Sequence, residues 1–403
     1  MAAIPPSWIN SEFLEKALRS NGKHPDVRVI SFDIKRAALA GDHYGSEMYR
    51  AIVKTRENGN TEETSVIIKL ELTRGQLSET VKISNVFMQE VNAFTDVHGA
   101  LSAILEDAIP DLQPFAAKCI YVHHAPQARG MVLEDLKTEG FRLANVSLGL
   151  DLKHCQLVLG KIAQYHAASI VLHEKNPNCF QKFLSNFYNS DSVKKFEPVV
   201  RGPIRSCAEM ISTCPGYEKY VDVLHSLEDT LVPDMRKAIA MDDSGYNVLN
   251  QGDLWLNNIM FRYNEDSQQV QDVRFVDYQL SYYSSPVVDL FYFLISSTSP
   301  ELLNNIDLLL NEYYITLCGT LCKLGYQNLQ PSMDTLKSEW NKKYAFGIYS
   351  AITMRAFALA DRNHVPDVDN LMAERESMHL SEAYKKSIKH ILPLFMKWGW
   401  LKI

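Results

Sequence analysis

The stretch from residue 247 to residue 289 limits the possible folds of this chain more than any other part of it. It contains three short apolar runs, at residues 247–249, 259–261 and 273–276, and polar turns separate them. Short apolar runs bounded by polar turns are typical of buried strands joined by a loop and a hairpin. The pattern therefore predicts that the polar residues at the ends of these runs meet in space.

Three of those polar residues have side chains that suit phosphoryl transfer. Asp253 and Asn258 lie five residues apart in the first turn, and Asp277 follows the third run. A carboxylate at Asp253 can accept a proton from a hydroxyl, while an amide oxygen and a second carboxylate suit a magnesium ion. Each piece alone is more typical of an ordinary polar turn. Together and in this order they predict Asp253 as catalytic base, and Asn258 and Asp277 as metal ligands.

Composition excludes several other classes of protein. The chain has 403 residues, 46% of them hydrophobic and 22% charged, which is typical of a globular protein. The net charge of -7 and the lack of a dense basic cluster argue against a nucleic-acid partner. Seven cysteines without paired CxxC spacing indicate reduced thiols, so we expect a cytoplasmic location. We expect neither a signal peptide nor a membrane span, because no run of 18 apolar residues occurs.

The first third of the chain reads as a small lobe built on a sheet. A helix begins at Ser11, and strand-like runs follow at residues 27–38, 47–54, 64–72, 116–123 and 130–133. They predict a five-stranded antiparallel sheet. The turn between the first two runs holds Gly41, Gly45 and Ser46, whose backbone amides could cover phosphates, although such a turn is more often a plain hairpin.

Two further features of this lobe indicate a nucleotide site. Lys69 lies in an otherwise apolar strand, so it needs a counter-charge if it points inward, and Glu90 on the helical stretch 81–105 is the best partner. A solvent-facing Lys69 and Glu90 would be the plain alternative. Glu134 and Leu136, at the exit from the last strand, are candidates for backbone contacts to a base; the alternative is a simple linker.

Beyond residue 140 the pattern is mainly helical. We therefore predict an α+β, bilobal protein with a nucleotide-binding lobe at residues 1–136 and a larger catalytic and acceptor-binding lobe at residues 137–403. Only eleven residues separate Asp277 from Asp289. This segment is too short to dock a peptide, so a small-molecule acceptor fits better. We expect Asp289 to cap a helix and to brace the loop that carries Asp253.

The chain resembles the ecdysteroid kinase-like family, whose members are abundant in insects and share the choline/aminoglycoside-kinase fold, a protein-kinase-like fold. The resemblance covers most of the chain, and it is most specific at residues 248–261, 273–279 and 284–290. It implies ATP-dependent phosphorylation of a hydroxyl on an ecdysteroid or a similar apolar metabolite or xenobiotic. It also implies that Lys69, held by Glu90, binds the phosphates. The family usually has histidine where this chain has Gln251, so we expect catalysis to be weakened rather than abolished.

Two other functions stay open. A catalytically silent ligand-binding protein would be consistent with Gln251, but it would have no chemical need for Lys69, Glu90, Asp253, Asn258 and Asp277 together. A choline or aminoglycoside kinase would need acidic residues to hold a cationic substrate. The acceptor itself cannot be read from the sequence, because no motif marks its pocket.

Overall fold

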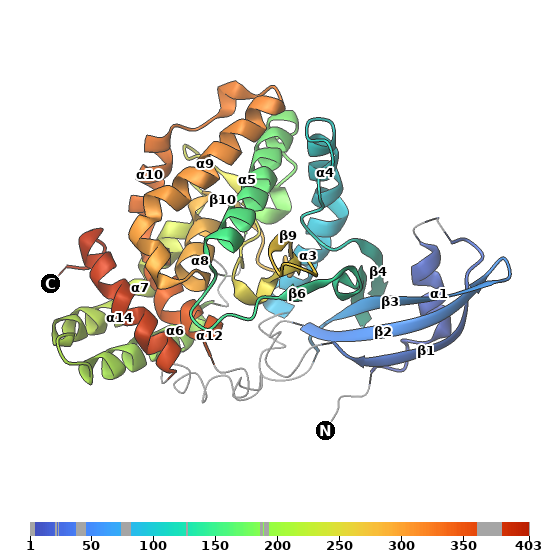
Figure 1. The fold of residues 1–403 in the computed structure, drawn as a ribbon, viewed down its shortest axis with the longest axis horizontal. Coiled ribbons are helices and arrows are strands. Elements are labelled where there is room, and N and C mark those ends of the chain that lie inside the picture. The colour runs from blue at the N-terminus through green and yellow to red at the C-terminus, as the bar shows by residue number, and fades with distance from the viewer. Residues whose placement is uncertain are drawn as a thin grey trace.

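A five-stranded sheet and a body of helices lie side by side in the computed structural model (Figure 1). The structure describes residues 5–20, 22, 24–37, 46–73, 82–125, 128–185, 188, 193–360 and 381–402, with side chains left out for 193–200. Within these ranges, no helix has both the length and the apolar character that a membrane span requires.

The sheet of the first lobe is antiparallel throughout and has the strand order β1-β2-β3-β5-β4. Its strands are β1 (Arg28–Arg36), β2 (Ser46–Glu57), β3 (Asn60–Glu71), β4 (Cys119–Ala125) and β5 (Ala128–Glu134). Asn58 and Gly59 join β2 to β3, and both have positive φ, 51° and 84°. Asn-Gly supplies such a turn with little strain, which matches the twist of the hairpin.

Different helices cover the two faces of this sheet. On one face, α1 (Ser11–Arg19) buries Phe13 and Leu14 against residues such as Ile68. Asn10 caps that helix by accepting a hydrogen bond from the backbone N–H of Phe13 at 3.0 Å. On the other face, Ile67 packs against α3 (Val86–Asn92). Helix α3 continues through a π-helical turn (Ala93–Val97) into α4 (His98–Glu106).

The second lobe is mainly helical and buries one large hydrophobic cluster. Its helices are α5 (Leu152–Lys175), α6 (Val193–Ser212), α7 (Val221–Ile239), α8 (Val287–Ser297), α9 (Ile306–Lys323), α10 (Met333–Lys342), α11 (Tyr344–Tyr349), α12 (Arg355–Ala358) and α14 (Glu382–Lys397). In Figure 1, α5, α8 and α9 form the centre of this body, and α3 and α4 stand between it and the sheet. The predicted α+β, bilobal fold is confirmed.

The second lobe also contains two small sheets. One has the order β6-β8-β9, and the other pairs β7 with β10. The bounds are β6 (Phe141–Leu143), β7 (Val248–Asn250), β8 (Ile259–Tyr263), β9 (Val270–Phe275) and β10 (Tyr282–Ser284). The loop and the hairpin predicted from the three apolar runs are therefore present. The division at residues 136 and 137 stays a prediction.

Candidate active site

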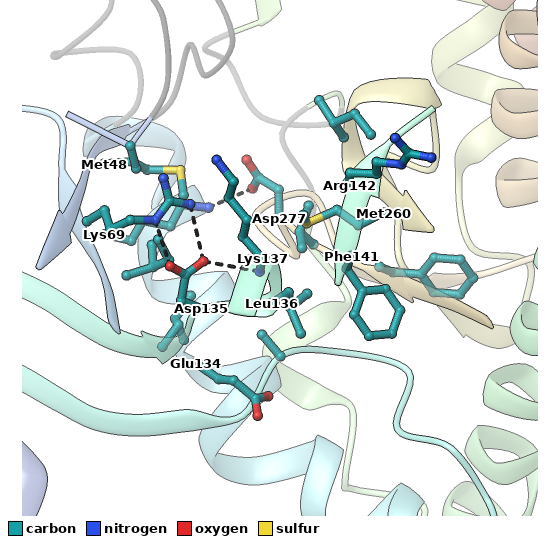
Figure 2. A pocket seen from close by; sticks show the side chains of 18 of the residues that line it. Met48, Lys69, Glu134, Asp135, Leu136, Lys137, Phe141, Arg142, Met260 and Asp277 are labelled. Atoms are coloured by element: carbon teal, nitrogen blue, oxygen red, sulfur yellow. Dashed lines mark hydrogen bonds and ion pairs between the residues drawn. The ribbon is translucent and has the colours of Figure 1, made fainter. Parts of the chain in front are cut away.

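A cavity of about 320 Å³ lies where the two lobes meet. Figure 2 shows it from close by, with Lys69 and Asp277 on one side and Phe141, Arg142 and Met260 on the other. Both lobes contribute to its lining, which includes Met48, Arg50, Ile67, Lys69, Glu90, Leu133, Glu134, Asp135, Leu136, Lys137, Phe141, Arg142, Asn257, Met260, Val276 and Asp277. A cavity of this size is within the range of sites for small molecules and cofactors.

The alternation of β3 turns Lys69 toward α3, on the same face as Ile67. There the Lys69 ammonium lies 2.6 Å from a carboxylate oxygen of Glu90 and 3.0 Å from one of Asp277. The lysine and Glu90 side chains are only 3% and 1% exposed. Burial opposes a charged lysine, but the two carboxylates outweigh it and raise the pKa of Lys69. The predicted pair is thus brought together, and Asp277 joins it.

Glu90 also ties α3 to the segment after β9. Its second carboxylate oxygen accepts a hydrogen bond from the backbone N–H of Tyr278 at 3.2 Å. Gln89, the residue before Glu90 on α3, donates to the backbone oxygen of Ser281 at 2.8 Å. The position of α3 therefore sets the distance between Lys69 and Asp277. Asp277 itself has a left-handed backbone, with φ 62°, a conformation that aspartate tolerates better than most residues.

Asp253 and Asn258 close a tight loop between β7 and β8. The amide nitrogen of Asn258 donates to the Asp253 carboxylate at 2.7 Å and to its backbone oxygen at 3.0 Å. Because an amide group is planar, these bonds turn the Asn258 oxygen to the opposite side. Gly252 begins the loop with φ 86°, and a Cβ atom there would lie 1.9 Å from the backbone oxygen of Leu280. Only glycine fits this approach.

The electrostatic setting of Asp253 disfavours its charged form. Burial raises its pKa to about 7, and the negative charge of Asp277 adds to the effect. Hydrogen bonds from Tyr292 and Asn258 offset part of this rise. A carboxyl whose pKa lies near neutrality is suited to general acid–base work, and a nearby cation would shift its equilibrium toward the charged form.

Gln251 joins the loop of Asp253 to the segment of Asp277. Its side chain is buried and uses all of its main hydrogen-bonding directions. The amide nitrogen donates to the backbone oxygens of Val276, at 3.0 Å, and Asp277, at 2.7 Å. The amide oxygen accepts the backbone N–H of Asp253 at 2.7 Å. Gln251 thus makes the bracing contacts that we expected from an amide, and it holds the two aspartates in one arrangement.

Asp289 braces the same loop from α8. Its two carboxylate oxygens accept the backbone N–H groups of Gln251 and Gly252 at 2.7 Å and 2.8 Å. His166 on α5 contacts the same carboxylate at 3.1 Å, and its other ring nitrogen contacts Tyr313 at 2.8 Å. Asp289 lies in the first turn of α8, where the helix dipole favours a negative charge. The bracing role that the sequence predicted is therefore present, but the predicted helix cap is wrong, because Pro286 occupies the cap position of α8.

The exit from β5 also lines the cavity. Glu134 and Leu136 lie beside it, and in Figure 2 the carboxylate of Glu134 points away from the other labelled side chains. Asp135 between them binds the Arg50 guanidinium at 2.6 Å and 3.2 Å and the Ser65 hydroxyl at 2.6 Å. Asp135 therefore fastens this segment to β2 and β3, a contact that the sequence did not suggest.

Part of the predicted phosphate turn is outside the described residues. This applies to Gly41 and Gly45. Ser46, at the start of β2, is described; its side chain is buried, and its hydroxyl has no hydrogen-bond partner among the described residues. The predicted roles of these three residues stay predictions.

Sequence reasoning missed several residues that surround the predicted site. Arg50 and Met48 line the cavity from β2, and Tyr292 contacts Asp253 from α8. The alternation of β2 was a usable signal for the first two, because residues two apart share a face. Nothing local marks Tyr292, since it is separated from Asp253 by β8, β9 and β10.

The comparisons with known proteins come from three sources. A profile of the ecdysteroid kinase-like family matches residues 40–326. A comparison with curated proteins found no match. Solved structures that are similar include the GDP complex of a mutant aminoglycoside 2'-phosphotransferase-IIIa, with 11% identity, 93% of this chain and 100% of that chain covered, and a TM-score of 0.37.

A structure described as a fructosamine-3-kinase from Haemophilus somnus 129PT has 11% identity and a TM-score of 0.39, over 90% of this chain and 96% of that one. Likenesses of this extent carry no information about individual residues. The family profile spans most of the chain, and its match includes β3, α3, the loop of Asp253 and the segment of Asp277. The chain therefore belongs to the ecdysteroid kinase-like family.

Proposed function

We propose that the protein is an ATP-dependent kinase that transfers a phosphoryl group to a hydroxyl of a small apolar molecule, such as an ecdysteroid or a xenobiotic. One observation carries this proposal: Lys69, Glu90 and Asp277 meet at one cavity, and Gln251 ties the loop of Asp253 to the same place. Phosphoryl transfer depends mainly on positioning and on charge neutralisation, and this arrangement provides both.

The donor set of the cavity suits a magnesium nucleotide. The described residues include no group of three or more His, Cys, Asp or Glu side chains that could hold a metal alone. Magnesium bound to a nucleotide needs fewer protein ligands, because phosphate oxygens and water complete its shell. Asp277 and the amide oxygen of Asn258 would hold the ion, which would neutralise charge on the transferred phosphate.

The remaining steps belong to side chains of this chain. Lys69 would bind phosphate oxygens, while Glu90 keeps its ammonium in place at 2.6 Å. Asp253 would accept a hydrogen bond from the acceptor hydroxyl, direct its oxygen at the phosphorus and take up its proton. Gln251 and Asp289 would keep the loop of Asp253 fixed during the reaction. The free state of the seven cysteines agrees with the cytoplasmic location that we propose.

Two other functions would use the same fold. A silent binding protein would keep the cavity without turnover, but the hydrogen bonds of Gln251 remove the reason to suspect that this side chain disables the loop. A choline or aminoglycoside kinase would differ only in the acceptor. Both are outcomes of one experiment.

The experiment is mass spectrometry of ecdysone, other sterols, choline, an aminoglycoside and plant phenolics after incubation with the protein, ATP and magnesium. Asp253→Asn removes the proposed base. Asp307→Asn makes the same change at an exposed aspartate that pairs with Lys337, and serves as the matched control. We expect a phosphoryl mass gain on an apolar acceptor that is lost only in Asp253→Asn. ATP binding without any mass gain would favour the silent protein, and a gain only on cations would favour the choline or aminoglycoside type.

A further inference from the structure

A buried tyrosine hydroxyl contacts the proposed base. Tyr292 is 1% exposed, and its hydroxyl is hydrogen-bonded to the side chain of Asp253. Tyr292 follows Asp289 by three residues on α8, so the two side chains lie on one face of the helix. Asp289 binds the backbone of the loop at Gln251 and Gly252. Tyr292, about one helix turn after Asp289, contacts the side chain of Asp253, the residue that follows Gly252 in the loop.

Packing holds the ring of Tyr292 in place. Its ring centroid lies 5.8 Å from that of Phe346 on α11. Behind it are Tyr188 and Tyr349, whose rings are 6.1 Å apart and nearly perpendicular. The Tyr188 hydroxyl is hydrogen-bonded to those of Tyr292 and Tyr349. The hydroxyls of three buried tyrosines, which are far apart in the sequence, therefore form a row of hydrogen bonds that ends at Asp253.

The hydrogen-bond inventory at Asp253 fixes the donor. An ionised carboxylate only accepts, so the Tyr292 hydroxyl donates to it. Asn258 donates to the same carboxylate at 2.7 Å, and the side chain of Trp255 is hydrogen-bonded to it as well. The terminal torsion of an aspartate side chain is broad, and a carboxylate with one donor can therefore rotate. Tyr292 donates from α8, whereas Asn258 and Trp255 belong to the loop itself, so the Tyr292 hydroxyl restricts the rotation from a separate element and leaves the remaining lone pairs in a fixed direction.

We propose that Tyr292 is a positioning residue for phosphoryl transfer: together with Asn258, its hydroxyl holds the Asp253 carboxylate in the orientation that meets the acceptor hydroxyl. This role rests on the proposed kinase function. Loss of the Tyr292 hydroxyl leaves the ion pair between Lys69 and Asp277 intact, and it should reduce the fraction of molecules in which Asp253 faces the acceptor.

The test compares Tyr292→Phe with Tyr384→Phe in the full chain. Tyr384 is also fully buried in the helical lobe, where its hydroxyl contacts the Cys207 sulfur and the Ile352 backbone oxygen, away from the proposed reaction. The readouts are kcat and KM for ATP, with the panel compound that the parent protein phosphorylates fastest, and the thermal unfolding midpoint. If Tyr292→Phe does not fold, the second variant is Tyr188→Phe, which removes the hydroxyl that is hydrogen-bonded to Tyr292.

We expect Tyr292→Phe to lower kcat by about 10- to 100-fold with little change in KM for ATP or in the unfolding midpoint. Tyr188→Phe should lower kcat by a smaller factor, and Tyr384→Phe should leave it unchanged. If Tyr292→Phe keeps the kcat of the parent, or if kcat and the unfolding midpoint fall while KM for ATP rises, the positioning role is wrong while the kinase function stands. If the parent phosphorylates no compound of the panel, both proposals fail.

Discussion

Replacement of Asp253 by asparagine should stabilise the protein, and more so at higher pH. The reason is the setting of this carboxyl, which burial and the charge of Asp277 disfavour in its ionised form. Its pKa of about 7 lies well above the ordinary 3.8. A residue kept for chemistry at the cost of stability is common at active sites. Asparagine is nearly the same size and carries no charge.

The sign follows from proton linkage. The pKa of Asp253 is higher in the folded state, so the folded protein holds this proton more tightly than the unfolded chain does. Stability is therefore lost as pH rises from about 4 to about 7, and the loss is complete above the folded pKa. The difference between 3.8 and about 7 corresponds to about 4 kcal/mol. Because Asp253 is not fully shielded from water, screening reduces this to about 1 to 3 kcal/mol.

The assay is urea unfolding followed by circular dichroism, without magnesium or nucleotide, at pH 5 and pH 8. The parent, Asp253→Asn and Asp307→Asn are compared, since Asp307 is an exposed aspartate that pairs with Lys337. We expect the advantage of Asp253→Asn in free energy of unfolding to be larger at pH 8, and Asp307→Asn to follow the parent. An advantage that is the same at both pH values would refute the argument that the folded state raises the pKa of Asp253.

Three more predictions concern contacts that hold the site and the lobe. Gln251→Leu removes three buried hydrogen bonds, two to the segment of Asp277 and one within the loop of Asp253, so kcat should fall by about 100-fold. Gln251→His can make two of the three bonds and should stay within about tenfold of the parent. A large rise of kcat in Gln251→His would mean that the natural glutamine impairs the enzyme. Glu90→Gln removes the charge that holds Lys69, so KM for ATP should rise about tenfold in initial-rate measurements. A KM for ATP equal to that of the parent protein would contradict this role. Arg355→Met leaves the backbone oxygens of Ile295 and Thr298 without their donors at 2.7 Å and 2.8 Å, and urea unfolding should show a loss of about 3 kcal/mol. No change in that unfolding free energy would show that water replaces the guanidinium there.

The sequence predicts those parts of the fold in which local pattern decides the structure. The five strands of the first lobe follow from strand-like runs bounded by turn residues, and Asn58-Gly59 marks the hairpin between β2 and β3 correctly. The approach of Lys69 to Glu90 was also predictable, because a buried lysine needs a partner and α3 offers only one buried carboxylate. In each case a single physical requirement, such as a turn with positive φ or a counter-charge for a buried lysine, could be met by few residues within a short stretch of chain.

Contacts between distant residues were beyond the same reasoning. Arg50 and Asp135 form an ion pair across 85 positions of the chain, and the partner of Arg50 could have been any exposed carboxylate. The contact of Tyr292 with Asp253 depends on how α8 packs under the loop, which no periodic pattern specifies. The sequence thus indicated candidate groups for the chemistry and two residues that hold them, Glu90 and Asp289, but it did not indicate the contacts of Asp135 and Tyr292.

The loop of Asp253 shows why this division arises. Gly252 has no room for a side chain, and β7 ends at Asn250, so regular backbone pairing does not orient the loop. Its orientation comes instead from the buried carboxylate of Asp289 and from the amide of Gln251. A buried carboxylate that accepts two backbone N–H groups is costly to rearrange, because any other position leaves the charge or the N–H groups without partners. The proposed base can therefore be indicated by a short motif, while its geometry is encoded by side chains on α8 and in the loop itself. If Asp253 is the base, changes at either place should alter turnover without touching Asp253.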